Sequence, residues 1–316
     1  MQINVENLSK TFSPGMPYET RALSNINCEI GDGEFVAIIG HTGSGKTTLV
    51  QHIAGLVQPD EGRVVATLKD GTQTVISEKG KAAFAVRRRV GIVFQYPEYQ
   101  LFEETVLKDV CFGPKNQGLD QAAQEERARD ALRLVGLDPD AVGESSPFEL
   151  SGGQKRRVAI AGVLAVDPEM LILDEPTAGL DPKGHDDILE MIDRIRAERS
   201  LSIVLVSHNM DDVAKYADKV IVMNSGTVVM EGTPEYVYCE RGSELKEIGL
   251  DLPAGPAFLE KLREGGLDVD IRRLTFEETA EEIVKALNKK AVKKTDNNAE
   301  KQSGSKAKKE PELQNN

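Results

Sequence analysis

The chain has 316 residues, of which 40% are hydrophobic and 5% aromatic, a composition typical of a soluble α/β protein with a large core. Its net charge of −13 argues against nucleic acid as the main partner, because phosphate backbones attract positively charged surfaces. The sequence contains no apolar run of about 18 residues, the length that spans a bilayer, and no recognisable signal peptide.

The first part of the chain is predicted to be rich in strands. Strand-like patterns of apolar residues occur at residues 3–12, 22–30, 34–40, 62–68, 74–80 and 90–95. The third of these is continuously apolar, as expected for a fully buried strand, and a helix should follow it from Lys46 to about Leu56. The fourth and fifth flank an Asp-Gly-Thr turn and predict a peripheral antiparallel sheet.

The second part of the chain alternates helices with apolar strands. A helical pattern covers residues 104–136 and includes an amphipathic stretch that Gly136 closes. Further helices are expected at about 153–166, 183–200 and 210–217, and strands at 169–176, 202–208, 219–225 and 227–232. This alternation predicts an α/β fold with a mostly parallel core sheet, covered by helices on both faces.

The chain divides into three predicted parts. Residues 1–235 form the main domain, whose helical subdomain covers about residues 96–165. Residues 236–288 are rich in Leu and Glu and predict a small helical appendage. Residues 289–316 are rich in Lys, Asn, Gln and Ser without apolar periodicity, which indicates a disordered basic tail.

The segment "GHTGSGKTT" follows the buried strand, opens a helix and fills the phosphate-loop pattern G-x-x-x-x-G-K-[ST]. Its glycines let backbone N–H groups turn toward phosphates, and the helix N-terminus adds partial positive charge. Lys46 is predicted to reach the β- and γ-phosphates, Thr47 to hold Mg²⁺ and Thr48 to contact the α-phosphate. The predicted nucleotide-binding residues of this loop are Gly40, His41, Thr42, Gly43, Ser44, Gly45, Lys46, Thr47 and Thr48.

Polar side chains at strand ends complete a predicted site for ATP or GTP. Asp174 ends a buried strand and is expected to support Mg²⁺, while the adjacent Glu175 is expected to polarise a water for attack on the γ-phosphate. Gln95 ends another strand and is predicted to contact Mg²⁺ or the attacking water. His208 follows a strand that should lie beside the phosphate-loop strand, which would aim it at the γ-phosphate.

A second cradle for anions lies more than a hundred residues after the phosphate loop. It is the segment "LSGGQ", which comprises Leu150, Ser151, Gly152, Gly153 and Gln154. A hydroxyl and backbone N–H groups at the start of a helix suit a phosphate. One nucleotide-binding chain therefore carries two cradles.

Five motifs, "GHTGSGKTT", "VFQ", "LSGGQ", "LILDEPTAGLD" and "VSH", occur in this order and resemble ABC-type ATPases over about residues 1–235. The resemblance implies that two nucleotide-binding domains pair head to tail, so that each LSGGQ signature faces the ATP held by its neighbour. It also implies a D-loop at that interface, made of Ala178, Gly179, Leu180 and Asp181. An adenine-stacking aromatic is expected before the phosphate loop, which favours ATP; Phe12 is the first choice and Tyr18 its competitor.

Two observations indicate which class of ABC protein this is: the spacing between two of the motifs, and a second resemblance. Thr47 and Asp174 are 127 residues apart, which excludes a long inserted coiled coil, and a single cassette disfavours the ribosome-acting type. Residues 93–118 and the appendage resemble the ATPases of energy-coupling factor importers, and the motifs look like the second of their two types. This resemblance implies a peripheral protein at the cytoplasmic face of the membrane. It implies as partners a second ABC ATPase, a membrane coupling protein and substrate-binding membrane subunits.

The predicted docking groove for the membrane coupling protein combines acids with apolar side chains. It comprises Glu98, Tyr99, Leu101, Phe102, Glu103 and Glu104. An arginine-bearing helix would find both apolar contacts and carboxylates there. A solvated acidic helix with an aromatic core face is the alternative interpretation.

The sequence therefore predicts an ATP-hydrolysing motor subunit that powers the uptake of vitamins or other micronutrients. A dedicated cobalt or nickel importer and a non-transport regulatory ATPase are the alternatives. The transported substrate, and whether the partner ATPase is a second copy of this chain, stay open.

Overall fold

The computed structural model describes residues 1–290, and in this part of the chain six strands form one sheet in the order β10–β9–β3–β8–β7–β6. Its strands are β3 (Phe35–Ile39), β6 (Val90–Val93), β7 (Met170–Asp174), β8 (Ser202–Val206), β9 (Lys219–Asn224) and β10 (Thr227–Gly232). The first five are parallel neighbours, and β10 pairs antiparallel with β9. The predicted mostly parallel sheet is confirmed, with the phosphate-loop strand β3 beside β8.

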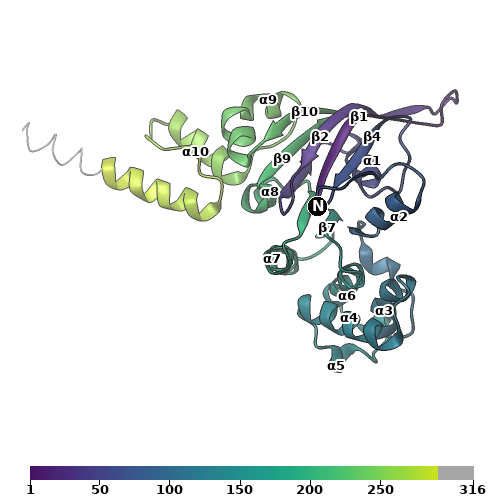
Figure 1. Cartoon of the computed structure of the whole chain (residues 1–316). Helices are drawn as coiled ribbons and strands as arrows, with labels where there is room; N and C mark the ends of the chain where they lie inside the picture. Colours follow the sequence, from purple (N-terminus) through teal and green to yellow (C-terminus); the bar gives the residue numbers. More distant parts are fainter. Residues whose placement is uncertain (291–316) are drawn as a thin grey trace, which may run out of the picture.

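A second sheet is antiparallel and lies across the first (Figure 1). In the order β2–β1–β4–β5 it contains β1 (Gln2–Phe12), β2 (Thr20–Ile30), β4 (Glu61–Thr67) and β5 (Gln73–Val75). One apolar cluster joins the sheets, with Ile3 and Leu23 on one side and Ile38 and Val204 on the other, and all four side chains are fully buried. Helix α1 (Lys46–Ile53) contributes Leu49 to the same cluster. The face of the main sheet toward the N-terminal strands is thereby closed.

The opposite face of the main sheet is covered by helices. Helix α7 (Pro182–Arg199) packs Ile188 and Ile192 against Leu173 and Leu205 of the sheet. Helix α8 (Met210–Tyr216) covers the neighbouring strands. The short helix α2 (Lys81–Arg87) was not predicted, because seven residues with two buried positions are too few to show a helical period.

A helical subdomain projects from one edge of the main sheet (Figure 1). Its helices are α3 (Val106–Asn116), α4 (Gln121–Leu134), α5 (Pro139–Val142) and α6 (Gly152–Leu164). Side-chain oxygens of Thr105, Asp120 and Ser151 accept hydrogen bonds at the starts of α3, α4 and α6, which satisfies backbone N–H groups that a helix leaves unpaired. Gly136, at φ 77, follows α4 as predicted.

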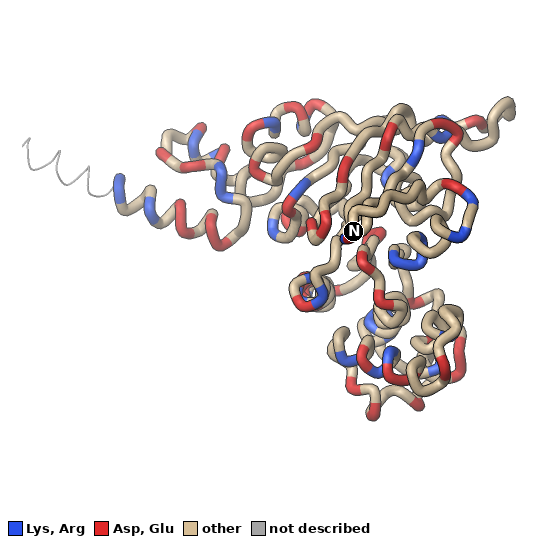
Figure 2. Tube along the Cα trace, viewed as in Figure 1, with Lys and Arg blue, Asp and Glu red and all other residues tan. Residues whose placement is uncertain are grey.

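The C-terminal appendage packs against β3, β9 and β10 of the main sheet. It contains η3 (Tyr236–Glu240), α9 (Gly242–Glu247), α10 (Ala254–Glu264) and a last helix over residues 276–290. Val237, Leu245 and Leu250 are buried in one cluster with Ala37 and Ile39 of β3. The last helix extends away from the rest of the molecule (Figure 1). Figure 2 shows that acidic residues are spread over all parts of the described chain. The tail predicted from residue 289 lies outside the described residues, apart from two residues that end this helix.

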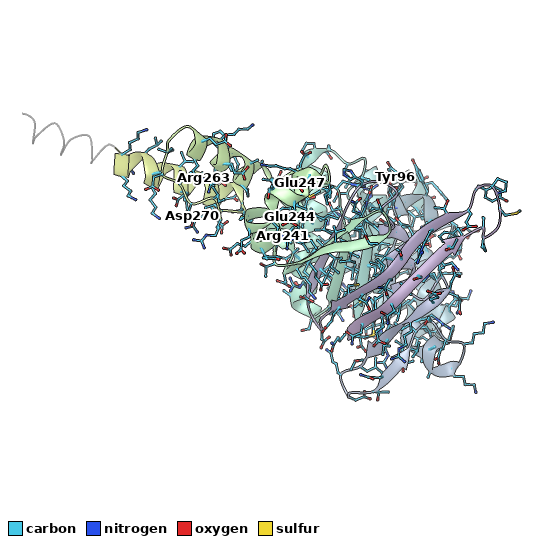
Figure 3. All side chains as sticks on the ribbon, turned by 90° about the horizontal axis from the view of Figure 1, so that it is seen from above. Tyr96, Arg241, Glu244, Glu247, Arg263 and Asp270 are labelled. Atoms are coloured by element: carbon cyan, nitrogen blue, oxygen red, sulfur yellow. The ribbon has the colours of Figure 1, made fainter. Side chains whose placement is uncertain are left out.

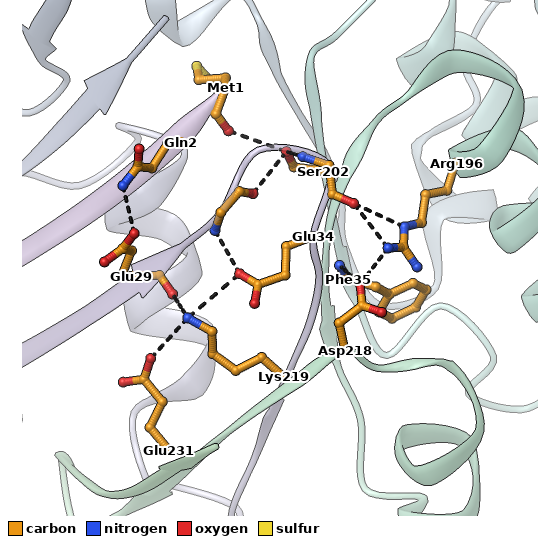
Figure 4. A network of polar contacts seen from close by, with 12 residues as sticks. Met1, Gln2, Glu29, Glu34, Phe35, Arg196, Ser202, Asp218, Lys219 and Glu231 are labelled. Atoms are coloured by element: carbon orange, nitrogen blue, oxygen red, sulfur yellow. Dashed lines mark hydrogen bonds and ion pairs between the residues drawn. The ribbon is translucent and has the colours of Figure 1, made fainter. Parts of the chain in front are cut away.

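A polar network ties the start of β3 to both sheets and to α7 (Figure 4). Asp218 accepts from the Phe35 backbone N–H at 2.9 Å and pairs with Arg196 of α7. Lys219 donates to the Glu29 carbonyl at 2.7 Å and pairs with Glu231 at 3.1 Å. These contacts hold the phosphate-loop strand in place at its amino end.

Arg156 of α6 ties the helical subdomain to the main sheet. It is 1% exposed, and its Nε and Nη2 donate to the two carboxylate oxygens of Glu98 at 3.0 and 2.6 Å. Glu98 lies in η1 (Pro97–Gln100), which follows the predicted Gln95. Nη1 of Arg156 donates to the carbonyls of Pro176 and Ala178 at 3.0 and 2.8 Å. One guanidinium therefore joins three segments distant in sequence.

No helix in residues 1–290 is both long and apolar enough to span a membrane.

We predict that Arg156→Ala lowers the free energy of unfolding by about 3–5 kcal/mol, because it leaves the Glu98 carboxylate partly buried without its partner. Urea denaturation monitored by circular dichroism measures the change. Lys108→Ala is the control: it breaks an exposed i,i+4 pair with Glu104 and should change stability by about 0.5 kcal/mol or less. Equal effects of the two substitutions would contradict the role given to Arg156.

Candidate functional site

The loop between β3 and α1 adopts a conformation that only glycine fits at two of its positions. Gly40 has φ 148 and Gly45 has φ 102. A Cβ at Gly40 would lie 2.2 Å from the Met223 carbonyl oxygen, and one at Gly45 would lie 2.6 Å from the Ala22 carbonyl oxygen. The loop therefore packs its backbone against β9 and β2 at these two glycines, and the absence of side chains there lets a ligand approach the loop backbone closely.

Lys46 is buried at the start of α1. Its Nζ donates to the carbonyls of Gly40 and His41 at 2.7 and 2.9 Å. Burial lowers the pKa of Lys46, while the nearby carboxylates of Glu175 and Asp174 act in the opposite direction. An ammonium group held only by carbonyl dipoles can turn to phosphate oxygens, which are stronger acceptors.

Hard oxygen donors gather next to Lys46, at the carboxyl end of β7. The Thr47 hydroxyl donates to Oδ2 of Asp174 at 3.0 Å. Asp174 is 6% exposed, and this burial raises its pKa against the opposing hydrogen bond from Thr47. A hydroxyl beside a carboxylate is the donor set that Mg²⁺ prefers in proteins, so the residues present fit that ion. The buried Ser44 hydroxyl has no partner among residues 1–290 and is free to donate to a phosphate.

Glu175 is held from both sides by the residues at two neighbouring strand ends. Its Oε1 lies 2.6 Å from Nε2 of His208, and its Oε2 accepts from Nε2 of Gln95 at 2.8 Å. The Glu175 backbone has φ 51, a left-handed conformation that a non-glycine residue adopts at a cost of about 1–3 kcal/mol. Both oxygens are thus oriented, and the strained backbone turns the carboxylate out of the strand.

Lys46, Thr47, Gln95, Glu175 and His208 face one open cleft of about 630 Å³. The residues that line it are Phe12, Thr20, Arg21, Ala22, Thr42, Gly43, Gly45, Lys46, Thr47, Thr48, Gln95, Glu175 and His208. Phe12 is 40% exposed and lines the cleft, whereas the competing Tyr18 is 65% exposed and is not among its lining residues. Thr20, Arg21 and Ala22 were not predicted, because only the pairing of β1 with β2 brings them to the phosphate loop.

The signature segment lies apart from this cleft. None of its five residues is among the described residues that line the cleft. The Ser151 side chain accepts from the Gln154 backbone N–H at 3.3 Å, and Gln154 Oε1 accepts from the Ser151 N–H at 3.0 Å, a reciprocal cap of α6. Ser151 and Gly152 are exposed, and a Cβ at Gly152 or Gly153 would meet open space. The predicted second cradle is therefore accessible from outside the chain.

The predicted D-loop runs from the cleft to the start of α7. The Ala178 carbonyl accepts from Arg156, and Gly179 has φ 78. Asp181 accepts from the Gly184 backbone N–H at 3.3 Å and so caps α7. Leu180 packs at the edge of the helical-subdomain core.

The predicted docking residues do not all share one environment. Tyr99 and Phe102 are 84% and 57% exposed, and Phe102 stacks edge-on against Phe112 with ring centroids 5.0 Å apart. Glu104 is exposed and pairs with Lys108, while Leu101 is buried. Glu98 departs from the expectation, because its carboxylate is already bound by Arg156 within the chain.

Arg156 itself was not singled out from the sequence. Arg156 stands between Lys155 and Arg157, and nothing in this basic run signals which guanidinium is buried. Only the packing of α6 against η1 places Glu98 beside it.

We predict that Asp174→Asn raises the melting temperature of the nucleotide-free chain at neutral pH. A raised folded-state pKa means that the charged carboxylate lowers stability above the ordinary Asp pKa of 3.8, so removing the charge stabilises the fold. The gain should shrink as pH falls toward 4, near that ordinary value of 3.8. Thermal unfolding at pH 7.5 and pH 5 measures it. Asp60→Asn is the control with opposite sign, because a hydrogen bond from Lys10 lowers the pKa of Asp60.

Comparisons with known proteins show the family of the chain. Residues 23–178 match the family model described as ABC transporter. Two curated relatives are energy-coupling factor transporter ATP-binding proteins EcfA2, from Clostridioides difficile (50% identity, 91% of this chain, 98% of the relative) and Clostridium tetani (48%, 92% and 99%). Among solved structures, CbiO1 of Clostridium perfringens, part of the ABC transporter complex CbiONQ, is 38% identical with a TM-score of 0.67, over 82% of this chain and 98% of that one.

A dimeric ATP-binding cassette, MJ0796, solved in a post-hydrolysis state with ADP and phosphate, is 30% identical with a TM-score of 0.63, over 73% of this chain and 98% of that one. The likeness to the EcfA2 proteins extends over nearly the full length of both chains. The chain belongs to the ABC transporter family and, within it, to the energy-coupling factor transporter ATP-binding proteins of the EcfA2 type.

Proposed function

We propose that this chain hydrolyses ATP in the cleft above β7 and thereby powers an importer of the energy-coupling factor type. The observation that carries the proposal is the clamped carboxylate of Glu175, held by Gln95 and His208 beside the buried Lys46. A water placed between this carboxylate and a bound γ-phosphate would be polarised and aligned for in-line attack. His208 orients the same carboxylate and faces the γ-phosphate.

The roles of the other residues follow from their chemistry. The phosphate-loop N–H groups and Lys46 bind the β- and γ-phosphates, and Phe12 stacks on the adenine at the open end of the cleft. Thr47 and Asp174 would hold Mg²⁺, with Gln95 as a further oxygen donor, and the ion would neutralise charge on the phosphates. Burial already disfavours the charged Asp174, and a cation beside it would reverse that preference.

We further infer that hydrolysis needs a second ATPase, paired head to tail. Ser151 and Gly152 are exposed, and the signature residues lie outside the cleft of their own chain, which supports a role toward the ATP of a partner. Ser151 supplies a hydroxyl, and Gly152 and Gly153 supply backbone N–H groups with open space around them. A site split between two chains is complete only when the chains close, which couples ATP binding to motion.

The exposed aromatic side chains of the helical subdomain support docking to a membrane coupling protein. Tyr99 and Phe102, with the carboxylates of Glu103 and Glu104, offer apolar contact and negative charge on one surface. Through Glu98 and Arg156 this surface is linked to the carbonyls of Pro176 and Ala178, which follow Glu175 in the chain. The chain would then lie at the cytoplasmic face of the membrane as a peripheral protein.

Two alternatives remain weaker. A dedicated cobalt or nickel importer is favoured less, because the EcfA2 relatives are 46–50% identical and CbiO1 is 38% identical. A regulatory ATPase without a transport partner would have no use for an exposed pair of aromatic residues beside acids at the edge of the helical subdomain.

We predict that Glu175→Gln lowers ATP turnover by about 10²–10⁴-fold, the contribution of a positioned general base, while ATP still binds. Lys46→Ala is the comparison, since it should weaken ATP binding itself. Steady-state phosphate release and equilibrium ATP binding separate the two effects. Turnover of the Gln variant within a factor of two of the wild type would remove Glu175 from this role.

We predict that the combined change Tyr99→Ala, Phe102→Ala, Glu103→Lys and Glu104→Lys weakens assembly with the membrane coupling protein at least about tenfold, as expected when apolar contacts and charge pairs are lost together. Glu98 is left intact, because its loss would disturb Arg156 instead. The measurement is co-purification from detergent-solubilised membranes. Phe276→Ala, which removes an aromatic side chain 80% exposed on the appendage, should leave this assembly unchanged. Normal assembly of the quadruple variant would place the docking surface elsewhere.

A further inference from the structure

The phosphate loop touches the C-terminal appendage through one side chain. Nε2 of His41 lies 2.6 Å from the carbonyl oxygen of Ile248, 207 residues further along the chain. Since a carbonyl only accepts, Nε2 carries the hydrogen and donates it. Ile248 follows α9, where the last carbonyls of a helix have no intrahelical partner. This one hydrogen bond therefore gives a partner both to the Ile248 carbonyl at the end of α9 and to the Nε2 hydrogen of His41.

The turn after α9 is shaped around the His41 ring. Gly249 has φ +78, and a Cβ there would lie 3.2 Å from Nε2 and 3.5 Å from Cε1 of His41. The position thus needs glycine for its backbone and for the space beside the ring.

This turn is itself anchored to the sheet. Leu245 and Leu250 on either side of it are 0% and 6% exposed, in the apolar cluster that contains Ala37 and Ile39 of β3. Arg241, just before α9, pairs with Glu244 of that helix (Figure 3). Arg241 also donates to the hydroxyl of Tyr236 in η3 at 2.7 Å. The Ile248 carbonyl is accordingly a fixed acceptor and not the tip of a free loop.

The same histidine also contacts the nucleotide-binding lysine. The His41 carbonyl accepts from Nζ of Lys46 at 2.9 Å, while its side chain reaches Ile248. We propose that the α9 turn positions the phosphate loop for ATP through His41, so that the appendage sets the nucleotide affinity of the site. This inference rests on the proposed function, and His41 acts in it as a positioning residue.

The expected consequence follows from preorganisation. A loop held in its binding conformation loses less conformational freedom when the ligand arrives. Loss of one hydrogen bond of this kind is expected to raise the ATP dissociation constant about 2- to 10-fold. The rate constant of hydrolysis should not change, because the His41 side chain is not among the residues lining the cleft and does not contact Glu175.

The experiment compares four single variants of the full-length chain, His41→Ala, His41→Gln, Gly249→Ala and Gly266→Ala, and the double variant His41→Ala/Gly249→Ala. Gln retains a side-chain N–H that can donate to Ile248. Gly266 is the matched control for Gly249, because it has the same left-handed backbone, at φ +82, with nothing within 4 Å of a Cβ. The measurements are equilibrium binding of MgATP to the purified chain, KM and kcat in the assembled transporter, and the melting temperature.

We expect His41→Ala and Gly249→Ala to weaken MgATP binding and raise KM about 2- to 10-fold with kcat kept within twofold, and the double variant to be no weaker than either. His41→Gln and Gly266→Ala should bind as the wild type does, although both glycine variants lose thermal stability. Wild-type affinity in His41→Ala and Gly249→Ala, or equal losses in Gly249→Ala and Gly266→Ala, would overturn the inference. Failure of the wild type itself to bind MgATP would instead overturn the proposed function.

Discussion

The parallel pairing of β3, β8 and β7 is the constraint on which the rest of the molecule depends. Ile38 is in register with Val206, and Val206 with Asp174, so the three strands end at one level. The phosphate loop, His208 and Glu175 each follow directly from one of these ends. Because parallel strands present their carboxyl ends on one edge, three segments distant in sequence meet in a single cleft.

The residues at this edge of the sheet are held at a cost in free energy, which comes from buried charges and from a strained backbone. Burial disfavours the charged forms of Lys46 and Asp174, and Glu175 is held in a left-handed backbone conformation. A highly charged ligand relieves the first two costs, since phosphates pair with Lys46 and a cation pairs with Asp174. The site thus lowers the stability of the nucleotide-free chain, and in return it binds the charged ligand more tightly and orients the Glu175 carboxylate.

Three outer parts of the molecule are joined to the cleft or to the loops beside it by individual side chains. The antiparallel sheet contributes Phe12 to the lining of the cleft. Arg156 of the helical subdomain binds the segment that follows Glu175, and His41 of the phosphate loop binds the Ile248 carbonyl of the appendage. Movement of an outer part could therefore change the nucleotide site through each of these contacts. The Arg156 contact matters most, because the same guanidinium binds Glu98 of η1 and the carbonyls of Pro176 and Ala178, the second of which belongs to the predicted D-loop. For the proposed docking of a partner near Tyr99, a stiff link of this kind would carry movement to the segment beside Glu175.

The sequence by itself determined the elements and chemical roles that depend on local order. Apolar runs predicted the buried strands, and the glycine pattern before Lys46 predicted the phosphate loop, because turn, helix start and lysine are adjacent in the chain. Asp174, Glu175, Gln95 and His208 were predictable as strand-end residues, since strand ends can be located from apolar periodicity.

Only the tertiary structure decided contacts between segments whose spacing in the sequence carries no period. The sequence alone predicts that Glu98 binds an arginine of a membrane partner, whereas in the structure its carboxylate binds Arg156 of the same chain. The contact of His41 with Ile248 spans 207 residues, and neither residue type marks it. Burial and partner choice for a charged or polar side chain are set by packing of distant elements, which the local pattern of residues does not encode.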